Sequence, residues 1–209
     1  TKNGHPFAST LYQIDGVTAE GAVFRAERHP NIDGSRNDNS VSPYITFRAI
    51  PNDSGFAFVD LGGRMGVVNM DGSVTTWAGW VTQQDATPPS AWDLSISTAE
   101  LRASSKELRG VFEGGLDFRM PVDLVFDPRN NKIVYVADTG NHRITRTDLT
   151  NPGNPVTTTY AGIPRTAGYL DGPARQAQFS SPYTLDMAPD GTMYVGDRMN
   201  NAIRVISSD

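Results

Sequence analysis

The sequence predicts an all-β fold, a β-propeller built from four-stranded blades, and two observations lead to this prediction. Three segments align with one another, at residues 41–79, 120–162 and 181–209. Each contains short runs rich in Val, Ile, Tyr and Thr, separated by Gly, Pro, Asn and Asp, which is typical of strands joined by hairpins. Four strands in about 40 residues is the size of one propeller blade.

The composition agrees with a globular β protein and excludes several other classes. The 209 residues include 20 Gly and 14 Pro, which suits a chain with many turns. Cysteine is absent, which excludes disulfides, thiolate metal sites and cysteine nucleophiles. The net charge of −5 argues against nucleic acid as a partner. No apolar run approaches the roughly 18 residues of a membrane span.

Shared anchor residues set the limits of the blades. A proline opens each segment and an aspartate follows its second apolar run: Pro43, Pro121 and Pro182, then Asp60, Asp138 and Asp197. The runs VTTWAG (74–79) and VTTTYAG (156–162) close the first two segments. The third segment stops at RVISSD, where such a run would follow.

Two stretches lie outside the aligned segments. Residues 1–40 form an N-terminal extension, in which GAVFRAERH (21–29) suggests an outer or closing strand of the propeller. Residues 80–119 form an insertion between the first two blades. There Ser97 and Glu100 make a capping box and Leu101 and Leu108 fall on one helical face, so we expect this insertion to be partly helical.

The second and third segments resemble NHL-repeat propellers. The resemblance is carried by YVADTGNHRI, VTTTYAG and DGPARQAQFSSPYTLDMAPDGTMYVGDRMNNAIRV. The family takes its name from an Asn-His-Leu string, whose place is held here by Asn141 and His142. The similarity extends from about Met120 to Val205 and is weaker in the first segment. There Gly62, Gly63 and Arg64 replace the Asn-His pair.

Three blades do not close a ring, because propellers use about four to eight. An open array would leave unpaired strand edges, which promote aggregation. We therefore expect the chain to be part of a six-bladed ring. The alternatives are an assembly in which two copies supply three blades each, or an irregular propeller with further blades. In either of the first two cases, the partners include further subunits or copies that complete the propeller.

The sharpest cluster of polar residues follows the second strand of the second segment. A carboxylate that orients a histidine would suggest a base or a metal ligand. The third segment, however, keeps the Asp and the first Asn but has Asn201 where the histidine stands. A role that survives loss of the imidazole is hydrogen bonding, so we interpret the cluster as a structural blade corner. Its members are Asp138, Asn141, His142 and Arg143, with Asp197, Asn200 and Arg204 in the third segment.

Other candidate sites carry weaker signals. Asp33, Asn37 and Asp38 supply oxygen ligands suited to Ca²⁺, although their spacing does not match an EF-hand loop and such turns usually satisfy their own backbone. Trp80 and Trp92, in the insertion, are candidates for partner contact. No cofactor other than this calcium is expected.

The resemblance implies a non-catalytic module for protein–protein interaction or scaffolding within a larger assembly, because NHL propellers mostly act as interaction platforms. The alternative is part of an exported propeller enzyme, a metal-dependent lyase or hydrolase or a quinone-type oxidoreductase, with its site in the central channel. A chain that starts at Thr1 suggests a processed protein, and we expect an extracellular or periplasmic location.

Overall fold

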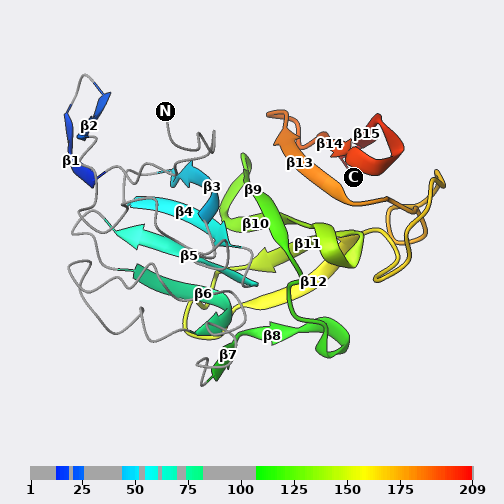
Figure 1. The fold of residues 1–209 in the computed structure, drawn as a ribbon, viewed down its shortest axis with the longest axis horizontal. Coiled ribbons are helices and arrows are strands. Elements are labelled where there is room, and N and C mark those ends of the chain that lie inside the picture. The colour runs from blue at the N-terminus through cyan, green and yellow to red at the C-terminus, as the bar shows by residue number, and fades with distance from the viewer. Residues whose placement is uncertain are drawn as a thin grey trace, which may run out of the picture.

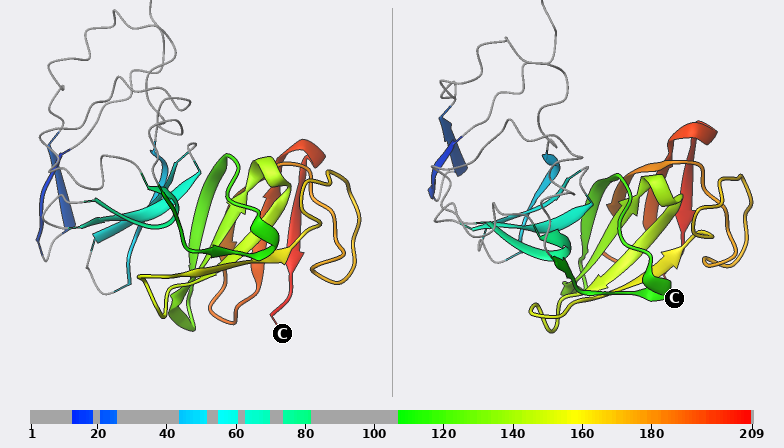
Figure 2. Two further views of the ribbon diagram at one scale, coloured as in Figure 1. Left: turned by 90° about the horizontal axis from the view of Figure 1, so that it is seen from below. Right: turned by 60° about the horizontal axis from the view of Figure 1, so that its bottom comes forward.

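The computed structural model describes residues 13–18, 21–25, 44–51, 55–60, 63–69, 74–81 and 107–208. Within these residues the secondary structure consists of β-strands and three short 3₁₀ turns. Three of the sheets correspond to the aligned segments, and they lie side by side in chain order, as Figures 1 and 2 show. The predicted propeller-type β fold is therefore confirmed.

Blade 1 is a five-stranded antiparallel sheet whose strands follow one another in the chain. They are β3 (Tyr44–Ala49), β4 (Gly55–Asp60), β5 (Arg64–Asn69), β6 (Val74–Val81) and β7 (Glu107–Arg109).

Blade 2 has four antiparallel strands and a short fifth strand on its outer edge. The four are β9 (Pro121–Asp127), β10 (Asn130–Asp138), β11 (Arg143–Asp148) and β12 (Val156–Ala161). The fifth, β8 (Val111–Phe112), pairs in parallel with β12.

Blade 3 has three described strands, β13 (Pro182–Met187), β14 (Met193–Asp197) and β15 (Ala202–Ile206). The inner strands β3, β9 and β13 contact one another in succession. Each blade therefore packs its inner strand beside that of the next blade, as in a propeller.

The segments outside the blades differ in part from expectation. Strand β2 (Gly21–Arg25) pairs with β1 (Gln13–Thr18) in a two-stranded sheet among the described residues. Leu108 lies in β7 and not in a helix, because the backbone of Glu107–Arg109 hydrogen-bonds to the end of β6. Ser97, Glu100 and Leu101 lie outside the described residues.

Two apolar clusters hold the blades together. One lies between blades 1 and 2 and includes Ala57, Val59, Met65, Leu124, Phe126, Val134 and Val136. The other lies between blades 2 and 3 and includes Ile133, Tyr135, Ala137, Ile144, Leu185, Met193 and Val195. Because alternate residues of a strand point to opposite faces, β10 contributes to both clusters.

The glycine that ends each complete blade is required by its backbone. Gly79 and Gly162 have φ values of +101° and +94°. A β-carbon at Gly162 would lie 2.9 Å from the His142 carbonyl oxygen, and one at Gly79 would lie 2.1 Å from the Gly63 carbonyl oxygen. The AG ending of the repeat thus allows the outer strand to approach the neighbouring corner closely.

Candidate functional site

The corner of blade 2 is a buried hydrogen-bond network centred on Asp138. Oδ1 accepts the Arg119 backbone N–H at 2.7 Å. Oδ2 accepts the Asn141 side-chain amide at 2.9 Å and Arg143 Nε at 2.8 Å. Asp138, Asn141 and Arg143 are all buried, so the three side chains hold one another within the protein.

The same network ties the blade to the chain segment that enters it. Asn141 donates to the Asp117 carbonyl oxygen at 2.9 Å. Arg143 donates to the Leu116 carbonyl oxygen at 2.7 Å and to Thr159 Oγ1 on the outer strand at 3.1 Å. The corner therefore connects the second, third and fourth strands of blade 2 with the segment before its first strand.

Blade 3 repeats this arrangement with one displaced residue. Asp197 accepts the Ser180 N–H at 2.7 Å and the Asn200 amide at 2.7 Å. Its cation is Arg204, at 3.2 Å, which stands two positions further along the strand than Arg143 does in blade 2. Because residues two apart on a strand share a face, either position can direct a guanidinium at the corner.

Arg204 has additional partners that Arg143 lacks. Its guanidinium lies over the rings of Tyr169 and Phe179, at 4.9 and 5.1 Å from their centroids, and pairs with Asp171. It also donates to the Gln178 carbonyl oxygen at 3.0 Å.

Blade 1 keeps the ion pair although it lacks the Asn-His pair. Arg64 Nε lies 2.8 Å from Asp60 Oδ2, and both residues are buried. Arg64 faces Asp60 across β4 and β5 as Arg143 faces Asp138 across β10 and β11. Sequence reasoning missed Arg64, although an arginine after the corner aspartate in all three segments was the available signal.

At the position of His142 the backbone conformation matters more than the chemistry of the imidazole. Its φ is +55°, and Asn201, at the equivalent place in blade 3, has φ of +50°. Asn and His are among the residues most tolerant of this left-handed conformation, which explains why they exchange here. The imidazole Nδ1 accepts the Ser181 backbone N–H at 3.0 Å, which links the blade 2 corner to the start of blade 3.

A second buried carboxylate, Asp123 on the inner strand of blade 2, connects all three blades. It pairs with Arg48 of blade 1 at 2.9 Å and accepts the Leu185 backbone N–H of blade 3 at 2.9 Å. Burial raises the pKa of Asp123, and the Leu185 N–H and the Arg48 guanidinium oppose this. The repeat pattern does not predict this role for Asp123, because the other two segments have threonines, Thr46 and Thr184, at its place.

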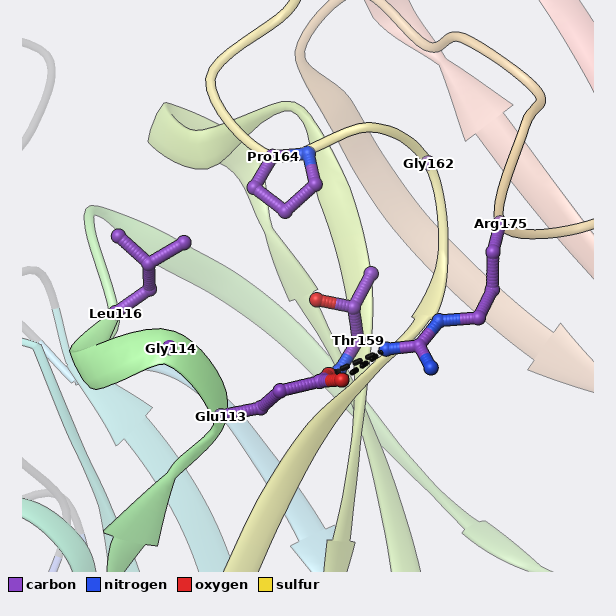
Figure 3. A pocket seen from close by; sticks show the side chains of 7 residues that line it. All are labelled: Glu113, Gly114, Leu116, Thr159, Gly162, Pro164 and Arg175. Atoms are coloured by element: carbon purple, nitrogen blue, oxygen red, sulfur yellow. Dashed lines mark hydrogen bonds and ion pairs between the residues drawn. The ribbon is translucent and has the colours of Figure 1, made fainter.

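A shallow hollow of about 250 Å³ lies at the outer edge of blade 2 (Figure 3). Glu113 accepts the Thr159 backbone N–H at 2.8 Å and pairs with Arg175 from the segment between blades 2 and 3. These bonds hold the pKa of Glu113 below its ordinary value, the Thr159 N–H contributing most. The charges of Glu113 and Arg175 thus neutralise each other, and their contacts connect the segment between blades 2 and 3 to the outer strand of blade 2.

The remaining candidates lie at the margin of the described chain. Trp80 is in β6, paired with Leu108, and its side chain is outside the described residues. Trp92, Asp33, Asn37 and Asp38 are outside them as well. In the part of the chain that is described, no three His, Asp or Glu side chains gather as metal ligands. No helix among the described residues is long and apolar enough to cross a membrane.

The geometry of the corner residues fits a structural role. The oxygens of Asp138 are held by three donors, and burial raises the pKa of this carboxyl while Arg143 opposes the rise. With the aspartate, amide and guanidinium all buried, none of them can reach a substrate in solution.

Comparison with known proteins agrees with the repeat and the fold. Over 77 residues the chain is 35% identical to SUPPRESSOR OF QUENCHING 1, a chloroplastic protein of Arabidopsis thaliana, across 37% of this chain and 7% of that protein. A protein of unknown function from Bacteroides thetaiotaomicron has a similar structure, with a TM-score of 0.54 and 18% identity over 76% of this chain and 34% of that one. An auxiliary nutrient binding protein of the same organism aligns with a TM-score of 0.49 and 21% identity, over 77% and 36% of the two chains.

The chain thus spans a small part of the curated relative and about a third of each of these structures. The family model of the NHL repeat matches residues 118–146, which contain β9, β10 and most of β11. Residues 118–146, which form the first part of blade 2 in this β-propeller fold, therefore match an NHL repeat.

Proposed function

We propose that the chain is a non-catalytic propeller module that binds a protein partner through its corner face. The corner face is the end of blades 2 and 3 that carries the turns after β10 and β14 and the segments before β9 and β13. It comprises residues 117–120, 139–142, 163–168, 180–183 and 198–201. The observation that carries the proposal is the burial pattern at this end: the aspartates and arginines of the motif are buried in the corner networks, while a different set of side chains faces solvent.

The solvent-exposed set includes several cationic and large apolar side chains. Arg119, Arg165 and Arg198 are exposed, and none of them has an ion pair with another described residue. Met120 and Met199 are exposed beside them. Arg and Met are enriched at protein interfaces, and paired charges across an interface steer association.

The charge of this face indicates the kind of protein surface that would fit it. Asp138 and Asp197, the carboxylates of the corners, are buried and already paired with arginines. The exposed residues Arg119, Arg165 and Arg198 therefore present positive charge to solvent, although the overall charge of the chain is −5. An acidic protein surface with apolar contacts for the two methionines fits this arrangement, and the negative total disfavours nucleic acid.

The test begins with a photo-cross-linking amino acid at Met120 or Met199, and at Val156 as the control. Val156 is exposed and starts β12 at the opposite end of blade 2. We expect both corner-face positions to cross-link the same protein in an extract of the source cells, and Val156 not to. Equal cross-linking from all three positions, or cross-linking to RNA, would contradict the proposal.

The purified partner then allows a quantitative test. Arg119→Glu and Arg198→Glu should each weaken binding by about tenfold, equivalent to about 1.4 kcal/mol, with a smaller effect at high salt. Lys132→Glu reverses an exposed charge at the opposite end of β10 and should leave binding unchanged. Equal losses for Lys132→Glu and the corner-face variants would argue for a non-specific charge effect.

A further inference from the structure

Backbone conformations that are unfavourable for residues with a β-carbon are concentrated on the corner face. Among the described residues, five other than glycine have a positive φ, between +49° and +63°: Met120, His142, Arg165, Ser181 and Asn201. Each of the five lies in one of the segments that form the corner face. Such conformations persist only where the surrounding structure enforces them, and they are common at functional sites.

The blade repeat accounts for four of these five residues. His142 and Asn201 hold equivalent places after the corner turns of blades 2 and 3. Met120 and Ser181 hold equivalent places directly before the first strands of the same two blades. Arg165 has no counterpart in this pattern, because it lies in the segment between the blades. Its conformation therefore has a separate cause.

Arg165 occupies a place in a tight turn that suits glycine. The Thr166 N–H donates to the Ile163 carbonyl oxygen at 3.1 Å and closes a turn of four residues. Pro164 is the second residue of this turn and Arg165, with φ of +63°, is the third. A proline followed by a residue of positive φ is typical of a type II turn, in which glycine is favoured at the third position. An arginine at this position is strained, and a glycine would not be.

The backbone of Arg165 is fixed to the corner of blade 2, while its side chain faces solvent. The Arg165 N–H donates to the Asn141 carbonyl oxygen at 2.8 Å, and Asn141 is 1% exposed within the corner network. The side chain of Arg165 is exposed and forms no ion pair with another described residue. Arg165 thus stands on a rigid base, and the described fold does not use its charge.

Arg119 lies on the other side of the same corner turn. Its carbonyl oxygen accepts the Gly140 N–H at 2.8 Å, and its side chain lies so close that a β-carbon at Gly140 would be 2.8 Å from Arg119 Cγ. Because Gly140 and Asn141 are consecutive, Arg119 and Arg165 flank one turn, and both charges favour an anion there. Asp117, the acidic residue of the corner face, is partly buried.

We propose that Arg165 is the anchor of the corner face and binds a carboxylate of the partner protein. This inference rests on the proposed function and identifies the residue that recognises the acidic partner. A guanidinium can donate two parallel hydrogen bonds to a carboxylate, so it suits an aspartate or glutamate side chain. The strained turn contributes because it fixes the backbone of the arginine before the partner binds.

The stability of the free protein tests the role of the turn, through the variants Arg165→Gly and Arg165→Gln. Both variants remove the charge, but only glycine relieves the strained backbone. We therefore expect Arg165→Gly to raise Tm by about 2 to 4 °C and Arg165→Gln to leave Tm nearly unchanged. Equal Tm values for the two variants would overturn the claim that the turn is strained in order to hold an arginine.

Binding of the protein that cross-links to Met120 and Met199 tests the role of the charge. Both Arg165 variants should weaken this binding by about tenfold or more. Arg175→Gln, which removes an exposed arginine outside the corner face, is the matched control and should bind as the wild type does. Treatment of the partner with phosphatase should leave binding unchanged, and loss of binding after this treatment would overturn the assignment to a carboxylate.

The outcomes separate this inference from the proposed function. If Arg119→Glu and Arg198→Glu weaken binding but both Arg165 variants bind as tightly as the wild type, Arg165 is not the anchor and the proposed function stands. If all corner-face variants bind as the wild type does, or if no partner is cross-linked, the proposed function and this inference are both wrong.

Discussion

Replacing Asp138 with alanine should be among the most destabilising substitutions in this chain. The change removes the acceptor of three hydrogen bonds, from the Arg119 N–H, the Asn141 amide and Arg143 Nε, at 2.7 to 2.9 Å. It also leaves the buried guanidinium of Arg143 without its carboxylate. Removing one partner of a buried ion pair costs about 3 to 5 kcal/mol, and we expect Asp138→Ala to lose this much.

Blade 3 supplies an internal comparison for this magnitude. Asp197→Ala breaks the equivalent ion pair, but Arg204 keeps Asp171, the rings of Tyr169 and Phe179 and two backbone carbonyls as partners. The guanidinium of Arg204 therefore keeps several stabilising contacts when Asp197 is removed. We expect Asp197→Ala to cost clearly less than Asp138→Ala.

Urea unfolding measured by tryptophan fluorescence and by circular dichroism gives the free energies. Asp138→Ala should lower the midpoint without a change in the slope, because a change in slope would signal altered two-state behaviour. In thermal unfolding the same loss corresponds to a fall of about 10 °C in Tm. A loss below about 1 kcal/mol, the net value of an ordinary hydrogen bond, would refute the buried-corner account. An equal cost for the two alanine variants would refute the assigned role of the extra Arg204 partners.

Three further changes probe the corner and its surroundings. His142→Asn should leave the free energy of unfolding nearly unchanged, since Asn201 adopts the same left-handed backbone in blade 3, whereas His142→Val should cost about 1 to 3 kcal/mol; equal unfolding midpoints for the two variants would contradict this. Gly162→Ala should lower Tm because a β-carbon would lie 2.9 Å from the carbonyl oxygen of residue 142, and an unchanged Tm would mean that the outer strand can shift. Hydrogen bonds from Arg129 hold the pKa of Asp127 below its ordinary value, so this carboxylate stabilises the fold above that value and loses the contribution as pH falls through the lowered pKa. Asp127→Asn should therefore flatten the fall in stability at acid pH in urea titrations, and an unaltered pH profile would contradict the assignment.

The sequence predicted the blades and their corners well because the same pattern of apolar runs and polar residues occurs in three segments. The aspartates at 60, 138 and 197 each end a second strand, as their spacing from the apolar runs indicated. The loss of the histidine in blade 3 also indicated that the motif is held by the aspartate and asparagine, and these residues hydrogen-bond to each other in blades 2 and 3.

Features that depend on contacts between distant segments could not be predicted from the repeat pattern. The motif predicted Arg204 at the corner, but it did not predict the additional partners of this residue, Tyr169, Phe179 and Asp171. Leu108 follows a helical pattern locally, but pairing with the end of β6 makes its segment a strand. Asp123 differs from its counterparts because its role is to accept bonds from the blades on both sides, which no single repeat encodes.

The central claim is that the blade corners are buried networks in which an aspartate holds the chain segment that enters the blade. Residue-by-residue hydrogen exchange tests it most directly, because the Arg119 backbone N–H donates to Asp138 and the Ser180 backbone N–H donates to Asp197. We predict that both N–H groups exchange slowly, and that Asp138→Ala accelerates exchange at Arg119 more than at Ser180. Exchange of the Arg119 N–H at the rate of an unprotected loop in the wild-type protein would contradict the claim.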